Sequence, residues 1–349
     1  MRHYFAEMNM EKENRIMGKI NQSIAELVGR TPLLQLNGYI KKHGLEADVI
    51  GKLEYFNPNQ SVKDRIALAM IEDAEQKGLL KPGDTVVETT SGNTGIGLAA
   101  IAAAKGYPFR VYIQDQVSEE RFKVIKAFGG KTIKLTQEPA IAKTLKETNG
   151  DFVAAIESLK REVLSKEENV VFVDQCANPA NPDVHRRTTG PEIWEDTDGK
   201  VDILVACVGT GGTISGTGAY LKAQNPNIKV VGVQPGPNSL PSDEKPEPDE
   251  EITGVHPFSG VPDNIIPANL DRHIYDEVIE VEALDAYQAA RDAAKADGIL
   301  VGTSSGAALF AAAQLAKRPE NRGKKIVAIF PDTGLRYLST NLFKSEEAE

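Results

Sequence analysis

The sequence predicts an α/β fold with mainly parallel sheets, arranged as two three-layer αβα domains. Short runs of β-branched residues, typical of buried parallel strands, alternate with longer segments of helical spacing along almost the whole chain. This alternation indicates parallel sheets that are covered by helices on both faces. The length of 349 residues is sufficient for two domains with a substantial core.

The apolar spacing predicts the individual elements in chain order. Strands are expected at residues 86–87, 110–113, 170–173, 203–206, 229–233 and 325–329. Helices are expected at residues 64–77, 95–105, 118–128, 216–223, 284–296 and 305–316. The segment from Asn238 to Glu251 holds three prolines and six acidic residues, so an exposed loop is expected there, long enough to act as a lid.

The composition argues against several classes of partner. Forty basic and fifty acidic side chains give a net charge of −10, which argues against nucleic acid or an anionic membrane as the main partner. No apolar run approaches the length of a membrane span, and residues 1–19 lack the apolar stretch of a secretory signal. We therefore expect a cytoplasmic protein. The two cysteines and five histidines show no metal-binding spacing, so no metal site is expected.

The turn Gly209-Thr-Gly-Gly-Thr213 follows an apolar run and precedes a helical segment. Three glycines in four residues let successive backbone N–H groups point the same way and, with a helix N-terminus, form a cradle for an anion. The turn lacks the ending of a nucleotide-triphosphate loop. Phosphate binding is one interpretation, and a tight turn that needs glycine for packing is the other.

A second polar turn, Thr89 to Gly95, offers small donors at another helix start. Such donors can hold a carboxylate. A competing interpretation is that the run Gly95 to Ala100 is a relaxed dinucleotide fingerprint, with Asp115 about twenty residues on as the ribose-binding acid. That interpretation predicts a nicotinamide-dependent oxidoreductase.

Two further residues at helix starts have a plain and a functional interpretation. Lys63 is either a surface lysine in a first helical turn or an amine for Schiff-base chemistry. Ser304, in Gly302-Thr-Ser-Ser-Gly306, is either a helix cap or a neutral hydroxyl that faces a heteroaromatic nitrogen.

Together, these segments resemble the fold-type II pyridoxal-phosphate enzymes, specifically the cysteine synthase and cystathionine β-synthase family. The similarity covers nearly the whole chain. The motifs that carry it, in order, are Ile24–Leu34, Asn57-Pro-Asn-Gln-Ser-Val-Lys-Asp-Arg65, Glu88-Thr-Thr-Ser-Gly-Asn-Thr-Gly95, Asn178–Pro182 with Thr188–Trp194, Gly209–Thr213 and Asp332–Thr340.

The resemblance implies a fold like that of the tryptophan synthase β-subunit, with the active site between two domains. An N-terminal domain of residues 50–165 would hold the cofactor lysine and the substrate loop. Residues 1–49 and 166–349 would form the larger C-terminal domain with the phosphate cup.

The resemblance also implies roles for individual residues toward the cofactor pyridoxal 5'-phosphate. Lys63 would form a Schiff base with it and later move the Cα proton of the substrate. Asn93 would bond its ring hydroxyl oxygen, and Ser304 would face its pyridine nitrogen. The residues expected to hold its phosphate are Gly209, Thr210, Gly211, Gly212 and Thr213. The residues expected to bind the substrate are Thr90, Ser91, Asn93, Thr94, Gln175 and Gly254.

The implied activity is a β-replacement that converts O-acetyl-L-serine and sulfide to L-cysteine and acetate. Alternatives with the same cofactor are cystathionine or lanthionine formation, and cysteine breakdown that releases hydrogen sulfide. A catalytically silent binding protein is a further alternative. The family resemblance also implies a homodimer, and the tail of a serine acetyltransferase is a possible partner.

The sequence departs from the family pattern in two places. His256, Ser259 and Asp263 bring polar groups into a stretch, residues 252–267, where the family usually has small residues. Residues 114–121 also differ from the usual run. Our hypothesis is that His256 or Asp263 tunes the choice of the thiol nucleophile.

Overall fold

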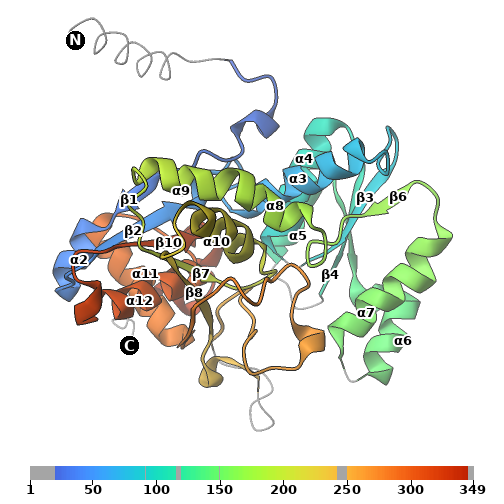
Figure 1. The fold of residues 1–349 in the computed structure, drawn as a ribbon. Helices are drawn as coiled ribbons and strands as arrows, with labels where there is room; N and C mark the ends of the chain where they lie inside the picture. The colour runs from blue at the N-terminus through green and yellow to red at the C-terminus, as the bar shows by residue number, and fades with distance from the viewer. Residues whose placement is uncertain (1–19, 91, 115–118, 149, 242–249, 345–349) are drawn as a thin grey trace, which may run out of the picture.

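The computed structural model describes residues 20–90, 92–114, 119–148, 150–241 and 250–344, and these form two sheets (Figure 1). The larger sheet has the strand order β1-β2-β10-β7-β8-β9. The smaller sheet has the order β5-β4-β3-β6. Within both sheets every neighbouring pair is parallel except β1 and β2, which are antiparallel.

Six strands build the larger sheet: β1 (Leu33–Gln35), β2 (Asp48–Leu53), β7 (Ile203–Cys207), β8 (Lys229–Pro235), β9 (Glu277–Val281) and β10 (Lys325–Phe330). Alternate residues of one strand pack into two separate cores: Val205 contacts the core on one face, and Leu204 contacts the core on the other. The first face is covered by α2 (Asn37–His43), α11 (Ala283–Asp297) and α12 (Thr303–Ala316). The second face is covered by α9 (Gly190–Asp196) and α10 (Gly212–Gln224).

The smaller sheet repeats this arrangement with β3 (Thr85–Thr89), β4 (Phe109–Ile113), β5 (Lys131–Lys134) and β6 (Val170–Phe172). Val86 packs against α3 (Lys63–Gln76), α4 (Asn93–Lys105), α5 (Glu119–Ala127) and α8 (Ala180–Val184). Val87 points the opposite way, toward α6 (Pro139–Glu147) and α7 (Phe152–Ser158). The expected three-layer αβα class is therefore confirmed for both sheets.

Short 3₁₀ and π turns connect these elements. The 3₁₀ turns are Ile24–Leu27, Glu54–Phe56, Leu135–Gln137, Leu164–Lys166, Pro237–Ser239, Asp263–Ile265, Pro319–Asn321, Gly334–Tyr337 and Asn341–Phe343. The π turns are Leu159–Val163 and His185–Thr189.

All six expected strands and all six expected helices are present, but β1, β2, β5 and β9 were not expected. Strand β2 contains Gly51 and Lys52, which are uncommon in buried strands. Gly51 is needed there because a Cβ atom would lie 2.7 Å from the Phe330 ring on β10. Helix α10 begins at Gly212, four residues before the expected start. Of the expected loop 238–251, residues 242–249 lie outside the described residues.

The division into two domains stays a proposal, but the strands suggest adjusted limits. Strand β2 extends to Leu53 within the larger sheet, and β6 extends to Phe172 within the smaller one. The limits at residues 50 and 165 therefore shift to just after these two strands.

A largely buried cluster of charges joins the larger sheet to helix α3. The Arg65 guanidinium donates to Glu54 at 2.7 and 2.9 Å and to Glu192 at 2.7 and 2.6 Å. Lys52, on β2, donates to Glu192 at 2.7 Å and to the Thr31 carbonyl oxygen at 2.6 Å. Burial alone would raise the pKa of Glu54, but Arg65 and Lys52 lower it to about 2. The two positive and two negative charges balance, so the cluster is tolerated in the core.

We expect Arg65→Met to lower the free energy of unfolding by about 3–5 kcal/mol, because it leaves Glu54 and Glu192 without their shared cation. Arg322→Met is the matched control, since Arg322 pairs with Glu46 at an exposed site, and it should cost less than about 1 kcal/mol. Urea unfolding near neutral pH measures both. Equal losses in the two variants would contradict the role given to the buried cluster.

Candidate functional site

Lys63 is the first residue of α3 and lies beyond the carboxyl end of β10. The preceding residues are tied to that end: Ser61 forms an isolated β-bridge with Asp332, and the Val62 N–H donates to the Pro331 carbonyl at 2.8 Å. Burial lowers the pKa of Lys63, and the charge of Asp332 partly opposes that shift. A lysine with a lowered pKa has more neutral, nucleophilic amine near neutral pH.

The glycine turn 209–213 leads from β7 into α10. Gly211 has a φ of +81°, which favours glycine, and a Cβ atom at Gly212 would lie 1.9 Å from Asn181 Oδ1. Among the described residues, no hydrogen bond uses the backbone N–H groups of residues 209–213 as donors. These N–H groups lie at a helix N-terminus, so the turn can accept an anion.

Two side chains that the sequence reasoning did not assign to the site hold the hydroxyls of this turn. His185 Nδ1 lies 2.8 Å from Thr189 Oγ1, and its Nε2 lies 3.3 Å from Thr213 Oγ1. Burial, helped by the nearby Arg65 charge, lowers the pKa of His185 to about 3, so the imidazole is neutral. Asn181 Nδ2 donates to Thr210 Oγ1 at 3.0 Å. Asn181 belongs to a motif noted in the sequence, whereas nothing in the sequence marked His185.

The second polar turn connects β3 to α4 and contacts Gln175, which follows β6. Thr94 Oγ1 donates to Gln175 Oε1 at 2.6 Å, so two of the expected substrate residues are in direct contact. The Thr90 N–H donates to the Tyr112 carbonyl at 3.1 Å, and the Thr90 hydroxyl accepts from the Gly92 N–H at 3.3 Å. Ser91 lies outside the described residues.

Glu88, at the end of β3, supports both parts of this site and was also missed. Its two carboxyl oxygens accept the N–H groups of Thr89 at 2.8 Å and Gln175 at 2.9 Å. The side chain is buried, and burial raises its pKa to about 8 despite these hydrogen bonds. Glu88 is therefore mostly uncharged at neutral pH.

Asn93 and Ser304 are brought to the same region from different sheets. Asn93 Nδ2 donates to Asp332 Oδ2 at 2.7 Å, and Arg336 donates to Asn93 Oδ1. Ser304 lies in the first turn of α12, is 7% exposed, and is next to Thr303, whose Oγ1 accepts the Thr253 N–H at 3.1 Å.

The stretch that departs from the family pattern divides into two parts. His256 lies beside the glycine turn, since its N–H donates to the Val208 carbonyl at 2.9 Å. His256 is an exposed residue, but partial desolvation of its imidazole lowers the pKa; the charge of Glu251 opposes this, and the charge of Lys63 adds to it. The expected substrate residue Gly254 is exposed with a φ of +74°. Asp263 instead pairs with Arg272 at 2.5 Å, with its side chain 85% exposed.

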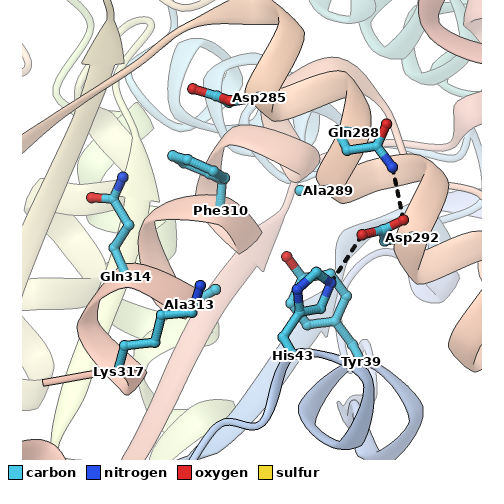
Figure 2. A pocket seen from close by; sticks show the side chains of 10 residues that line it. All are labelled: Tyr39, His43, Asp285, Gln288, Ala289, Asp292, Phe310, Ala313, Gln314 and Lys317. Atoms are coloured by element: carbon cyan, nitrogen blue, oxygen red, sulfur yellow. Dashed lines mark hydrogen bonds and ion pairs between the residues drawn. The ribbon is translucent and has the colours of Figure 1, made fainter.

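A cavity of about 290 Å³ lies elsewhere, between α2, α11 and α12 (Figure 2). Figure 2 shows that Tyr39, His43 and Phe310 line it and that Asp292 lies beside His43. Asp292 is already paired with Lys42 at 2.6 Å and His43 at 2.9 Å. None of the expected site residues lines this cavity, so it is distinct from the site around Lys63.

The dinucleotide interpretation of Gly95 to Ala100 disagrees with the structure. Both Gly95 and Gly97 lie inside α4 rather than in the turn before it, so they cannot form a phosphate-binding loop. A Cβ atom at Gly97 would lie 3.2 Å from Ala67, which indicates that this glycine allows close packing of α3 against α4. Asp115, the proposed ribose-binding acid, lies outside the described residues.

No helix in the described part of the chain is long and apolar enough to cross a membrane. Within the same ranges, no group of three or more histidine, cysteine, aspartate or glutamate side chains is arranged to hold a metal ion.

Comparisons with known proteins agree with this geometry. Cysteine synthase from Staphylococcus aureus (strain Mu50) is 42% identical over 326 residues, which is 93% of this chain and 98% of that protein. The solved structure of cysteine synthase from Entamoeba histolytica is 37% identical with a TM-score of 0.80, covering 95% of this chain and 94% of that one. A hydrogen sulfide-producing enzyme from Fusobacterium nucleatum is 36% identical with a TM-score of 0.79, covering 92% and 99% of the two chains.

The family model described as "Pyridoxal-phosphate dependent enzyme" matches residues 24–332, a range that includes every expected site residue. The structural relatives share the two-sheet α/β fold, and their identities lie well above the level at which only a fold is inferred. The chain therefore belongs to the family of pyridoxal-phosphate dependent enzymes.

Proposed function

We propose that this chain is a cysteine synthase, which converts O-acetyl-L-serine and sulfide to L-cysteine and acetate. The observation that carries the proposal is the convergence of an amine of lowered pKa, Lys63, with an anion-accepting turn and a second polar loop. The name of the S. aureus relative, which is similar over nearly its whole length, supports the same reaction.

The residues of this site fit pyridoxal 5'-phosphate. Its phosphate requires an anion cradle, and the N–H groups of residues 209–213 have no acceptor among the described residues. Its aldehyde requires an amine, which Lys63 offers. We propose that the Ser304 hydroxyl, at the start of α12, is the neutral partner of its ring nitrogen. When bound, the cofactor supplies an electron sink for the negative charge at the substrate Cα.

The side chains of this protein perform the remaining tasks. The Lys63 amine holds the cofactor, takes the Cα proton and later returns it to the same atom. Thr90, Thr94, Gln175 and the N–H groups of that loop bind the substrate carboxylate, with Ser91 as a further member. A mostly uncharged Glu88 beneath this loop avoids repelling that carboxylate. Ser304, unlike an acidic group, leaves the ring nitrogen unprotonated, which favours loss of the β-substituent over transamination.

An alternative uses the same groups but begins from cysteine and releases sulfide. It is favoured by the Fusobacterium relative, whose name says that it produces hydrogen sulfide, and by His256, a departure from the family pattern on which the charge of Lys63 acts. Incubation of the purified protein with each substrate pair separates the two: we expect cysteine from O-acetyl-L-serine and sulfide to form faster than sulfide from cysteine. The reverse order would move the assignment to cysteine breakdown.

We further propose, from the family resemblance, a cytoplasmic homodimer whose active site can receive the C-terminal tail of a serine acetyltransferase. Sedimentation of the purified protein, with and without a peptide of that tail, tests both parts.

Lys63→Ala should abolish covalent retention of the cofactor and lower turnover by at least about a hundredfold, because one amine serves as anchor and as proton carrier. Borohydride reduction followed by peptide mass mapping should find the cofactor attached to Lys63 in the unaltered chain and in the control below, but not in Lys63→Ala. Lys77→Ala removes an exposed lysine at the other end of α3 and is the control. A cofactor adduct on another lysine would contradict the assignment.

Glu88 should make substrate affinity depend on pH. Its pKa is raised to about 8, so as pH rises through that value it gains a negative charge beside the carboxylate-binding loop. The KM for O-acetyl-L-serine should therefore rise above pH 8 in the unaltered chain. In Glu88→Gln, which stays neutral, this extra rise should be absent. Steady-state kinetics from pH 7 to about 9 compare the two chains, and parallel KM profiles would exclude the effect.

His256 and Asp263 form a natural pair for testing the choice of nucleophile. His256 experiences the charge of Lys63, whereas Asp263 is exposed and paired with Arg272. We expect His256→Gly to change the ratio of kcat/KM for sulfide to that for cysteine or homocysteine by several-fold. Asp263→Ala should leave the ratio unchanged. If His256→Gly does not alter it, the departure from the family pattern has no role in nucleophile choice.

A further inference from the structure

We propose that Asp332 is a positioning residue for this site: its buried carboxylate orients the Asn93 amide and stabilises the protonated form of the Lys63 amine. This inference rests on the proposed function for its meaning, although its test does not measure turnover. The sequence alone assigns no role to Asp332. Its contacts with Ser61, Gly302 and Asn93 carry the inference.

The backbone of Asp332 joins the segments of two expected cofactor residues. Asp332 forms a β-bridge with Ser61, two residues before Lys63. Its carbonyl oxygen accepts the Gly302 N–H at 3.2 Å, two residues before Ser304. Displacement of Asp332 would therefore move the start of α3 and the start of α12 together.

The side chain of Asp332 reaches a third cofactor residue. Its Oδ2 accepts from Asn93 Nδ2 at 2.7 Å and from the Tyr337 hydroxyl at 2.8 Å. On the opposite side, Arg336 donates to Asn93 Oδ1 and also to the Asn59 carbonyl. The amide of Asn93 is thus held between an anion and a cation, so its orientation is determined. One of the two Nδ2 hydrogens remains to be donated to a ligand.

The carboxylate is buried and tightly enclosed. Asp332 is 1% exposed, and its Oδ1 has no hydrogen-bond partner among the described residues. A Cβ atom at Gly302 would lie 2.1 Å from that oxygen, so the glycine makes room for the carboxylate. Burial raises the pKa of Asp332, while the hydrogen bonds of Asn93 and Tyr337 and the charges of Arg336 and Lys63 lower it in part. In its ionised form, a carboxylate buried in this way acts strongly on its neighbours.

The other titratable groups around Lys63 do not replace this charge. The charge of Glu54 also raises the pKa of Lys63, but less than that of Asp332 does, and Glu54 is paired with Arg65. Cys176 is an exposed residue, but desolvation of its thiol raises the pKa to about 12, which keeps the thiol neutral. His185 is neutral, and desolvation also lowers the pKa of His256. Asp332 is therefore the acidic group expected to oppose the effect of burial on Lys63.

The test measures how fast the full-length chain, freed of cofactor, captures pyridoxal phosphate as a function of pH, followed by visible absorbance. Capture requires the neutral Lys63 amine. Asp332→Asn removes the negative charge but keeps an oxygen that can accept from Asn93. We expect its pH profile to shift downward by about one unit, which makes capture about tenfold faster on the acidic side, with nearly unchanged cofactor affinity. Asp332→Ala also loses the hydrogen bond to Asn93 and should bind the cofactor roughly tenfold more weakly.

Asp292→Asn is the matched control, because Asp292 is a buried carboxylate beside the distant cavity. Should Asp332→Asn fail to fold, Tyr337→Phe removes one donor to the same oxygen and should shift the profile in the same direction by less. An unchanged profile in the folded Asp332→Asn or Tyr337→Phe chain, or an equal shift in Asp292→Asn, would overturn the inference. A chain that captures no pyridoxal phosphate before any substitution would instead contradict the proposed function.

Discussion

The buried cluster of Arg65, Lys52, Glu54 and Glu192 is the interaction on which the site depends. Arg65 lies two residues after Lys63 on α3, Lys52 lies on β2 of the larger sheet, and Glu192 lies on α9. Helix α3 packs on the smaller sheet through its apolar residues, and the cluster joins it to the larger sheet as well. Because an unpaired charge is costly in the core, the stable structure is one in which all four charged side chains are paired. That constraint determines where the Lys63 amine lies.

The second constraint is the common edge at which parallel strands end. Asp332 follows β10, the glycine turn follows β7, Glu88 ends β3, and Gln175 follows β6. In parallel α/β sheets ligands bind outside the carboxyl ends of the strands, because the helix N-termini that follow them point N–H groups there. Two sheets contribute such edges to this site, and the contacts of Asp332 with Ser61, Gly302 and Asn93 join them.

Burial and charge act in opposite directions on the groups of the site. Burial lowers the pKa values of Lys63 and His185 and raises those of Glu88 and Asp332. The shifts at three of these groups fit the proposed roles: Lys63 gains nucleophilic amine, His185 stays neutral beside the proposed anion cradle, and an uncharged Glu88 would not repel a substrate carboxylate. Charged neighbours oppose this effect of burial: Arg65 and Lys52 outweigh it at Glu54, and the charges of Arg336 and Lys63 reduce it at Asp332. Pairing therefore decides which carboxyl groups in this core are charged.

The sequence by itself predicted the αβα class, and its motifs, through their resemblance to a known family, singled out Lys63, the glycine turn and the polar loop that contains Thr94. These features depend on local chemistry: apolar periodicity, glycine conformation and donors at helix starts. It left His185, Glu88, Asn181 and Asp332 without a role, and it allowed a dinucleotide fingerprint where the structure has a packed helix. Only tertiary structure decided these points, because a buried polar side chain has partners far away in sequence. For the same reason strand β2 could not be predicted from its sequence. Lys52 is explained by its ion pair with Glu192, 140 residues away, and Gly51 by the Phe330 ring, 279 residues away.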